Sequence, residues 1–209
     1  PNLFIKYGEG FIIDTKLTVN NFENINQTHF NADIKKIGVD FPKLFEIISY
    51  FTKKDININI PQKLNKLIYV GKLNGFLSDF HLNGTFISLV GKVQSNINIA
   101  HQNKWDNFTI KGDLHSKKID LGQALNNTNF GNTAFDVELS IDRINDTIDG
   151  YVDGNILEFG FKNYNYQNLT LTGNFNKNSF DGHAYLSDEN LKFKFDGLID
   201  FSHNPNIYQ

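Results

Sequence analysis

The fold is decided by Phe135-Asp-Val137-Glu-Leu139-Ser-Ile141, a stretch in which apolar and polar residues alternate without a break. Side chains of a β-strand point to opposite faces in turn, so this period of two indicates a strand with one apolar face and one polar face. The same alternation occurs at 56–60 and 191–195. Strands of this kind are typical of antiparallel sheets with one face covered and one face wet. The sequence therefore predicts an all-β, antiparallel protein.

Two short segments depart from this alternation. Between 41 and 51, apolar residues recur at helical spacing after Asp40, a residue that favours a helix N-cap. The segment 121–125 follows Asp120 in the same way. We expect helix only in these two places.

The strands that precede the two helices resemble each other. Residues 32–40 and 112–120 both carry a Lys-Lys pair and end in Asp, with an offset of 80 residues. Repeated strands predict an elongated stack in which each unit contacts its neighbours. We expect 1–209 to be a single elongated β-repeat segment, a curled antiparallel sheet divisible into sub-repeats 1–105 and 106–209. The chain contains no methionine, and we interpret it as part of a larger protein.

Composition excludes several functions. The chain has no cysteine, which excludes disulfides, thiolate metal sites and cysteine catalysis. Its net charge is −3, and no basic cluster interleaves with aromatic residues, so a nucleic-acid partner is not expected.

Glycines recur two residues after an apolar residue, which places them on the same face of a strand. Glycine in a strand permits bulges and sheet curvature, but it is also common in hairpin turns. We expect about half of the set to lie in turns, Gly150 and Gly154 among them, and the others to bend the sheet. The eight glycines are Gly75, Gly84, Gly112, Gly150, Gly154, Gly173, Gly182 and Gly197.

No catalytic or metal-binding motif stands out. The six histidines lack the spacing of a zinc site, and we interpret them as surface imidazoles. Asp142, Asp146, Asp149 and Asp153 do not match a calcium loop, so turn positions are expected for them. Trp105 is expected to pack at the core or an edge. A carbohydrate-active enzyme would need exposed aromatic residues beside paired carboxylates, which the sequence does not display. We therefore expect no enzyme activity, no cofactor and no metal.

Several stretches resemble the TamB family (AsmA-like superfamily) of the Bacteroidetes type. They include Tyr166-Gln-Asn-Leu-Thr-Leu-Thr-Gly-Asn-Phe175 and Phe180-Asp-Gly-His-Ala-Tyr-Leu-Ser-Asp-Glu-Asn-Leu191, with 118–126, 130–137 and 193–199. Together they cover most of 110–201, while the first 100 residues fit the family more loosely.

The resemblance implies a periplasmic segment of a cell-envelope protein anchored in the inner membrane. It also implies a trough with an aliphatic interior, of the shape called a β-taco, and a role in outer-membrane biogenesis. Family members are implicated in phospholipid transport between membranes and in outer-membrane protein assembly. The expected partners are phospholipid acyl chains, and an outer-membrane assembly protein at a C-terminal end absent from this sequence. Membrane contact is expected only through parts absent here, and the family has no catalytic residues to transfer.

We therefore expect a non-enzymatic scaffold or conduit with an apolar groove. The alternative is a module that holds unfolded outer-membrane protein strands by adding them to an exposed sheet edge. Plain core packing is an equal interpretation for any single lining residue. The candidate lining residues are Leu73, Leu82, Phe108, Ile110, Leu114, Phe135, Val137, Leu139, Ile141, Leu169, Leu171, Phe175, Phe180, Leu186, Leu191, Phe193, Phe195 and Ile199.

Overall fold

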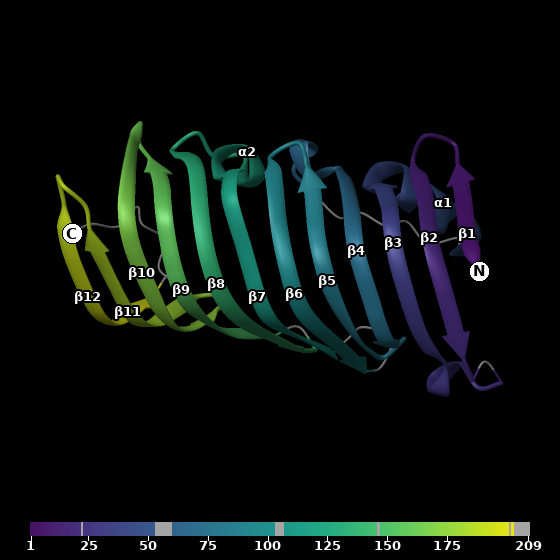
Figure 1. Cartoon of the computed structure of the whole chain (residues 1–209). Coiled ribbons are helices and arrows are strands. Elements are labelled where there is room, and N and C mark those ends of the chain that lie inside the picture. The colour runs from purple at the N-terminus through teal and green to yellow at the C-terminus, as the bar shows by residue number, and fades with distance from the viewer. Residues whose placement is uncertain (22, 53–59, 103–106, 146, 201, 203–209) are drawn as a thin grey trace.

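The chain forms one curled antiparallel sheet, which confirms the predicted fold class. The computed structural model describes residues 1–209 except 22, 53–59, 103–106, 146, 201 and 203–209. Within the described residues, twelve strands follow one another in chain order, and each pairs with the next. Figure 1 shows the strands side by side and bowed along their length, so that the sheet curls into a trough.

The strands are long, and together they make up more than half of the chain. Their bounds are β1 (Asn2–Tyr7), β2 (Phe11–Asn20), β3 (His29–Asp40), β4 (Lys66–Phe76), β5 (Asp79–Ser88), β6 (Gly91–Gln102), β7 (Asn107–Asp120), β8 (Phe130–Ile144), β9 (Thr147–Phe161), β10 (Tyr164–Asn176), β11 (Ser179–Ser187) and β12 (Lys192–Asp200).

Both predicted helices are confirmed, as α1 (Phe41–Thr52) and α2 (Leu121–Leu125). They lie at the same rim of the trough (Figure 1). Each begins after a strand-ending aspartate whose carboxylate accepts a backbone hydrogen bond, from Lys43 N at 3.4 Å for Asp40 and from Gln123 N at 2.9 Å for Asp120. Two single-turn 3-10 helices, η1 (Ile25–Gln27) and η2 (Gln62–Leu64), complete the described helical segments.

The strands that precede the helices share a backbone irregularity. The ladder between β3 and β4 shifts register between Ile34 and Ile37, and the ladder between β7 and β8 shifts between Ser116 and Ile119. In both strands the residues at the shift are a Lys-Lys pair. A register shift of this kind is a β-bulge, which bends the strand and increases its local twist. The two bulges and the two capped helices match the repeat seen in the sequence.

The expectation that glycines occupy hairpin turns is wrong. All eight lie inside strands, and Gly150 and Gly154 lie in β9. Four of them, Gly84, Gly150, Gly173 and Gly182, approach glycines or aromatic side chains of neighbouring strands. Close cross-strand packing therefore accounts for glycine at these positions. The acidic neighbours Asp149 and Asp153 are likewise strand residues, on the polar face of β9.

Candidate functional site

The apolar residues of all twelve strands form continuous rows that run across the sheet. Cross-strand partners in the ladders define these rows, and each row lies perpendicular to the strands, along the trough. The central row, here called the floor row, has no polar side chain. It consists of Leu17, Ala32, Leu73, Leu82, Ile97, Gly112, Leu139, Val152, Gly173, Gly182 and Gly197.

The row on one side of the floor row is also wholly apolar. It consists of Val19, Phe30, Gly75, Phe80, Ile99, Ile110, Ile141, Gly150, Phe175, Phe180 and Ile199. With strands about 4.8 Å apart, the ten intervals between β2 and β12 give an apolar track about 50 Å long. The acyl chains of one bilayer leaflet span about 15 Å, so the track is about three times that length.

The row on the other side of the floor row contains two hydroxyls, and both are turned towards the backbone. Thr15 Oγ1 donates to the Asp33 carbonyl at 2.9 Å, and Ser95 Oγ donates to the Gly84 carbonyl at 3.3 Å. Ser116, only 1% exposed, donates in the same way to the Lys92 carbonyl at 2.8 Å. A hydroxyl satisfied by its own sheet offers little to a ligand. These positions therefore do not interrupt the apolar character of the face.

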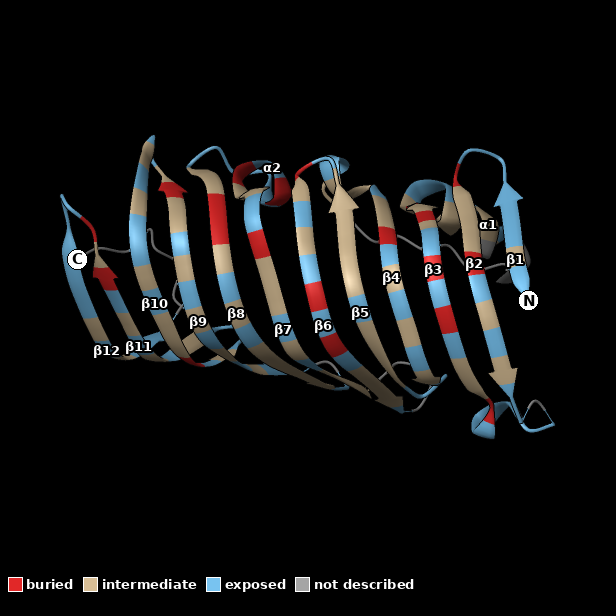
Figure 2. Ribbon diagram, viewed as in Figure 1, coloured by how far each residue is buried: buried red, intermediate tan, exposed pale blue. Residues whose placement is uncertain are grey.

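The predicted lining residues lie on this apolar face, with one exception. Leu191 lies in the connection between β11 and β12 rather than in a strand. The others lie in β4, β5, β7, β8 and β10–β12, at positions that alternate with the polar-face residues. Leu186 is 8% exposed and Phe193 is 47% exposed, and most of the others fall between these limits. The face is thus shielded by its own curvature but not sealed (Figure 2).

An apolar hollow lies at the β1–β5 end, where the sequence had placed few lining residues. A cavity of about 680 Å³ opens there over the apolar face, and η1 and the β4–β5 turn border it. Of the predicted lining residues only Leu73 reaches this cavity. Sequence reasoning missed Leu3, Ile13, Leu17, Phe30, Ala32, Ile34 and Ile37. The alternation along 11–19 and 30–34 was the signal that could have identified them.

Aromatic side chains cover several glycines of the apolar face. The Phe180 ring lies over the cross-strand pair Gly173 and Gly182, so that a Cβ at Gly173 would stand 2.8 Å from Phe180 Cζ. The Tyr69 hydroxyl lies over Gly71 and Gly84, which are also cross-strand partners, and it donates to the Lys72 carbonyl at 3.0 Å. Burial raises the pKa of Tyr69. Gly71, Gly84, Gly173 and Gly182 are therefore covered by aromatic side chains.

The acidic residues considered for a metal do not gather at one point. Asp142 accepts a hydrogen bond from Thr109 at 2.6 Å, and Asp153 accepts one from Thr172 at 2.8 Å. Both lie in strands, on the polar face, so their expected turn positions are wrong. Asp146 and Trp105 lie outside the described residues. In the described part of the chain, no three His, Asp or Glu side chains stand close enough to hold one ion.

The histidines expected at the surface mostly border the polar face and the rims. Two of them contact carboxylates along the polar face, His115 Nδ1 with Asp136 at 3.2 Å and His183 Nδ1 with Asp196 at 3.1 Å. His81 contacts Asn96 at 2.8 Å, and His203 lies outside the described residues. The remaining two are His29, which packs edge-on against Phe76, and His101, which contacts the Leu77 carbonyl at 2.9 Å.

Comparisons of the chain with protein-family models, with curated proteins and with solved structures found no match. Within the described residues, neither helix is long and apolar enough to cross a bilayer. What the chain does has to be inferred from its own residues.

Proposed function

We propose that this chain is a non-enzymatic segment of a lipid conduit or assembly scaffold, in which the apolar face holds the acyl chains of phospholipids. The observation that carries the proposal is the floor row with its apolar neighbour row, an unbroken apolar track across the eleven strands β2–β12. Acyl chains need no hydrogen-bonding partners, and a track without polar interruptions suits them along its whole length.

The exposed area of the chain supports an occupant for this face. The accessible surface is 14554 Å², whereas a compact protein of 23.9 kDa exposes about 9,900 Å². The described sheet is a single layer, so both of its faces contribute to this excess. Covering apolar surface contributes about 25 cal/mol for each Å² removed from water. Acyl chains along the track would provide that contribution.

The sequence resemblance to the TamB family gives the proposal its setting. On that basis we place the chain in the periplasm, between the inner and outer membranes, where phospholipid transport and outer-membrane protein assembly both occur. The curled sheet with an apolar interior is the shape that the resemblance implied.

The direct test is mass spectrometry of lipids that remain with the chain after gentle purification from a bacterial envelope. We expect phospholipid in at least equimolar amount with the native chain and clearly less with Leu171→Asp. Thr170→Asp is the matched control, because Thr170 is the preceding residue of the same strand, is exposed on the polar side and has no carboxylate as a cross-strand partner. Equal lipid in the two variants, or none with the native chain, would contradict the proposal.

Edge pairing is the second candidate function, and one observation favours it. Strand β1 has a neighbour on only one side within the described sheet, and it exposes Phe4 and Tyr7, each 64% accessible. An edge strand with exposed apolar side chains is a template for a further strand. Phe4→Pro would remove pairing at this edge without touching the floor row. If Phe4→Pro abolishes the binding of unfolded outer-membrane protein strands while lipid retention is unchanged, those strands bind by pairing with this edge.

A further inference from the structure

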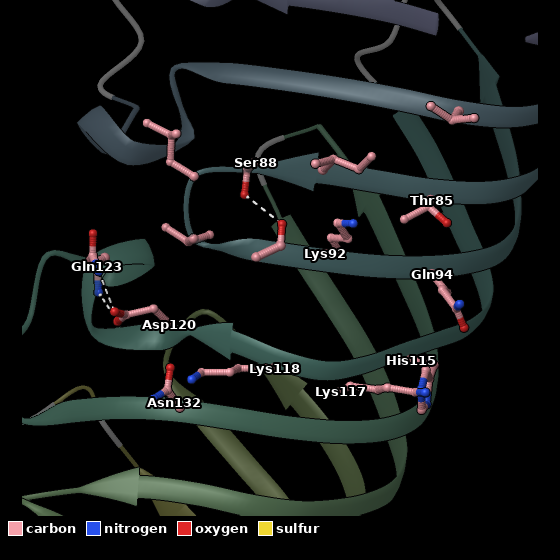
Figure 3. Close-up of a pocket in the computed structure, with 15 residues that line it drawn as sticks. Thr85, Ser88, Lys92, Gln94, His115, Lys117, Lys118, Asp120, Gln123 and Asn132 are labelled. Carbon is pink, nitrogen blue, oxygen red and sulfur yellow. Dashed lines mark hydrogen bonds between the residues drawn. The ribbon is translucent and has the colours of Figure 1, made fainter. Parts of the chain in front are cut away.

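A second hollow lies on the opposite, polar face of the sheet, near the rim that carries the helices. Its volume is about 1040 Å³, and residues of β4–β8, the β5–β6 turn and α2 line it. We call it the lysine pocket, because Lys92, Lys117 and Lys118 surround it (Figure 3). None of the rows of the apolar track passes through it, so its chemistry is independent of the trough.

The bulge between β6 and β7 creates this concentration of charge. Regular pairing stops at Gln94 with His115 and resumes at Gly91 with Ile119. Lys92 therefore lies in the shifted segment opposite Lys117 and Lys118. Within the described residues, none of the three ammonium groups forms an ion pair with a carboxylate. Like charges placed opposite each other in a sheet are destabilising unless a counter-charge lies among them.

The equivalent bulge of the first repeat provides an internal comparison. There the Lys35–Lys36 pair faces Asp14, which is the ladder partner of Lys36 and forms an ion pair with Lys35 at 3.9 Å. At the first bulge the two lysines thus share one carboxylate of the chain itself. At the second bulge Lys92 takes the facing position in place of a carboxylate.

Among the described residues that line the lysine pocket, Asp120 is the one carboxylate, and it is already engaged. Asp120 accepts hydrogen bonds from Gln123 N at 2.9 Å and from Gln123 Nε2, and these bonds cap α2. The Gln123 backbone and side-chain hydrogen bonds hold the pKa of Asp120 below its usual value, and Lys118 adds a smaller electrostatic contribution in the same direction. Three lysines against one carboxylate leave two formal positive charges in the pocket, although the whole chain carries −3.

The lysine pocket also has an apolar side. Val70, Ile87 and Leu89 border it opposite the bulge, and Leu89 is 68% exposed. Gln94, Gln123 and Asn132 add amide groups between the apolar and the charged parts. A phosphate monoester carries about −1.5 to −2 charges at neutral pH, which matches the two uncompensated positive charges.

We propose that the lysine pocket binds the phosphate-monoester head group of an anionic lipid, with the three lysines around the phosphate and the first apolar atoms against Val70, Ile87 and Leu89. Ammonium–phosphate hydrogen bonds are charge-assisted and roughly twice as strong as neutral ones. The apolar border distinguishes this site from one for free phosphate.

Calorimetric titration of the chain tests the proposal with three probes: dihexanoyl phosphatidic acid, dihexanoyl phosphatidylcholine and inorganic phosphate. We expect the phosphatidic acid to bind at least about tenfold more tightly than either of the others. Its affinity should fall as salt is raised, because ions screen the lysines over about 8 Å at 0.15 M ionic strength.

The variant Lys117→Gln/Lys118→Gln should weaken binding of the phosphatidic acid by roughly tenfold or more, while Lys35→Gln/Lys36→Gln should leave it unchanged. The unfolding temperature of each variant shows that it is folded. Inorganic phosphate or phosphatidylcholine binding as tightly as phosphatidic acid would overturn the proposal. Equal losses of affinity for phosphatidic acid in the two double variants would also overturn it. The ranking of the three probes and the effect of the double variants are both measured independently of lipid retention in the trough. The lysine-pocket proposal and the conduit proposal can therefore fail separately.

Discussion

The ring of Phe175 lies directly over Gly150, its cross-strand partner on β9, so that a side chain at Gly150 would overlap the ring. The glycine leaves room for the ring at this position, and an aromatic ring over a strand glycine restores packing that the glycine lacks. This relationship makes a specific coupling between the two positions testable.

Gly150→Ala should destabilise the native chain, because the new methyl group displaces the Phe175 ring. In a Phe175→Ala background the same change should cost nothing or stabilise, since alanine suits a strand better than glycine. We expect a coupling of about 1 kcal/mol, measured by urea unfolding of the four members of a double-mutant cycle. Additive effects of the two substitutions would show that the ring does not rest on Gly150.

Gly182→Ala should be more costly than most alanine substitutions in this sheet. A Cβ at Gly182 would overlap the Thr172 carbonyl and stand 2.5 Å from the Gly173 Cα, so the backbone itself has to move. Overpacking of this kind costs about 1–3 kcal/mol. Gly131→Ala is the matched control, because the nearest atom to its Cβ is 3.3 Å away. Equal unfolding free energies for the two variants would contradict the close approach of β10 and β11.

Stability should decrease in acid through Asp188, which closes the β11–β12 turn. Its carboxylate accepts hydrogen bonds from Asn190 N at 2.9 Å, Tyr164 Oη at 2.7 Å and Gln167 N at 2.9 Å, and these bonds lower the pKa of Asp188. A carboxyl whose pKa is lowered on folding stabilises the folded state above its unfolded pKa, about 3.9. That contribution is lost as the pH falls through the lower folded value.

Asp188→Asn should therefore reduce the free energy of unfolding at neutral pH and lose this effect below about pH 4. Urea unfolding of the native chain and the variant between pH 7 and pH 3 measures the difference. Glu189→Gln changes the next residue, an exposed carboxylate, and serves as the control. A difference between Asp188→Asn and the native chain that stays constant down to pH 3 would contradict the hydrogen-bonded carboxylate.

Leu171→Asp tests whether the apolar face is open. Leu171 is half-buried, and a carboxylate there retains access to water. We expect a loss of less than about 2 kcal/mol in unfolding free energy, compared with about 3–5 kcal/mol for an unpaired charge in a sealed interior. Leu186→Asp is the contrasting variant, because Leu186 is 8% exposed on the neighbouring strand. Similar large losses at both positions would indicate a closed core.

The alternation of apolar and polar residues predicted most of the strands, because it has the side-chain period of a strand with one face covered and one face exposed to water. Phe135 to Ile141 all lie in β8, and the sequence signal of 121–125 gives α2 with the same bounds. The Asp40 and Asp120 caps were identified for the same local reason, since each accepts a bond from a backbone amide three residues later.

The positions of the glycines and the hollows of the sheet depend on register, which the sequence does not display. Whether Gly150 lies in a turn or under a ring depends on which residue of β10 pairs with it. The lysine pocket likewise arises from a one-residue shift between β6 and β7. Short local patterns carry no information on cross-strand partners, so these features appear only once the ladders are known.

The central claim is that the apolar face contacts acyl chains in the cell, and site-specific photo-crosslinking tests it most directly. A photoreactive residue placed at Leu171 or Phe193 lies on the apolar face, whereas one at Lys192 or Lys194 lies on the polar face of the same β12 strand as Phe193. Irradiated cells should yield phospholipid adducts, detected by mass spectrometry, at the first two positions and not at the two lysines. Folded protein without adducts at Leu171 and Phe193, or adducts of equal yield at all four positions, would contradict the lipid-carrying account.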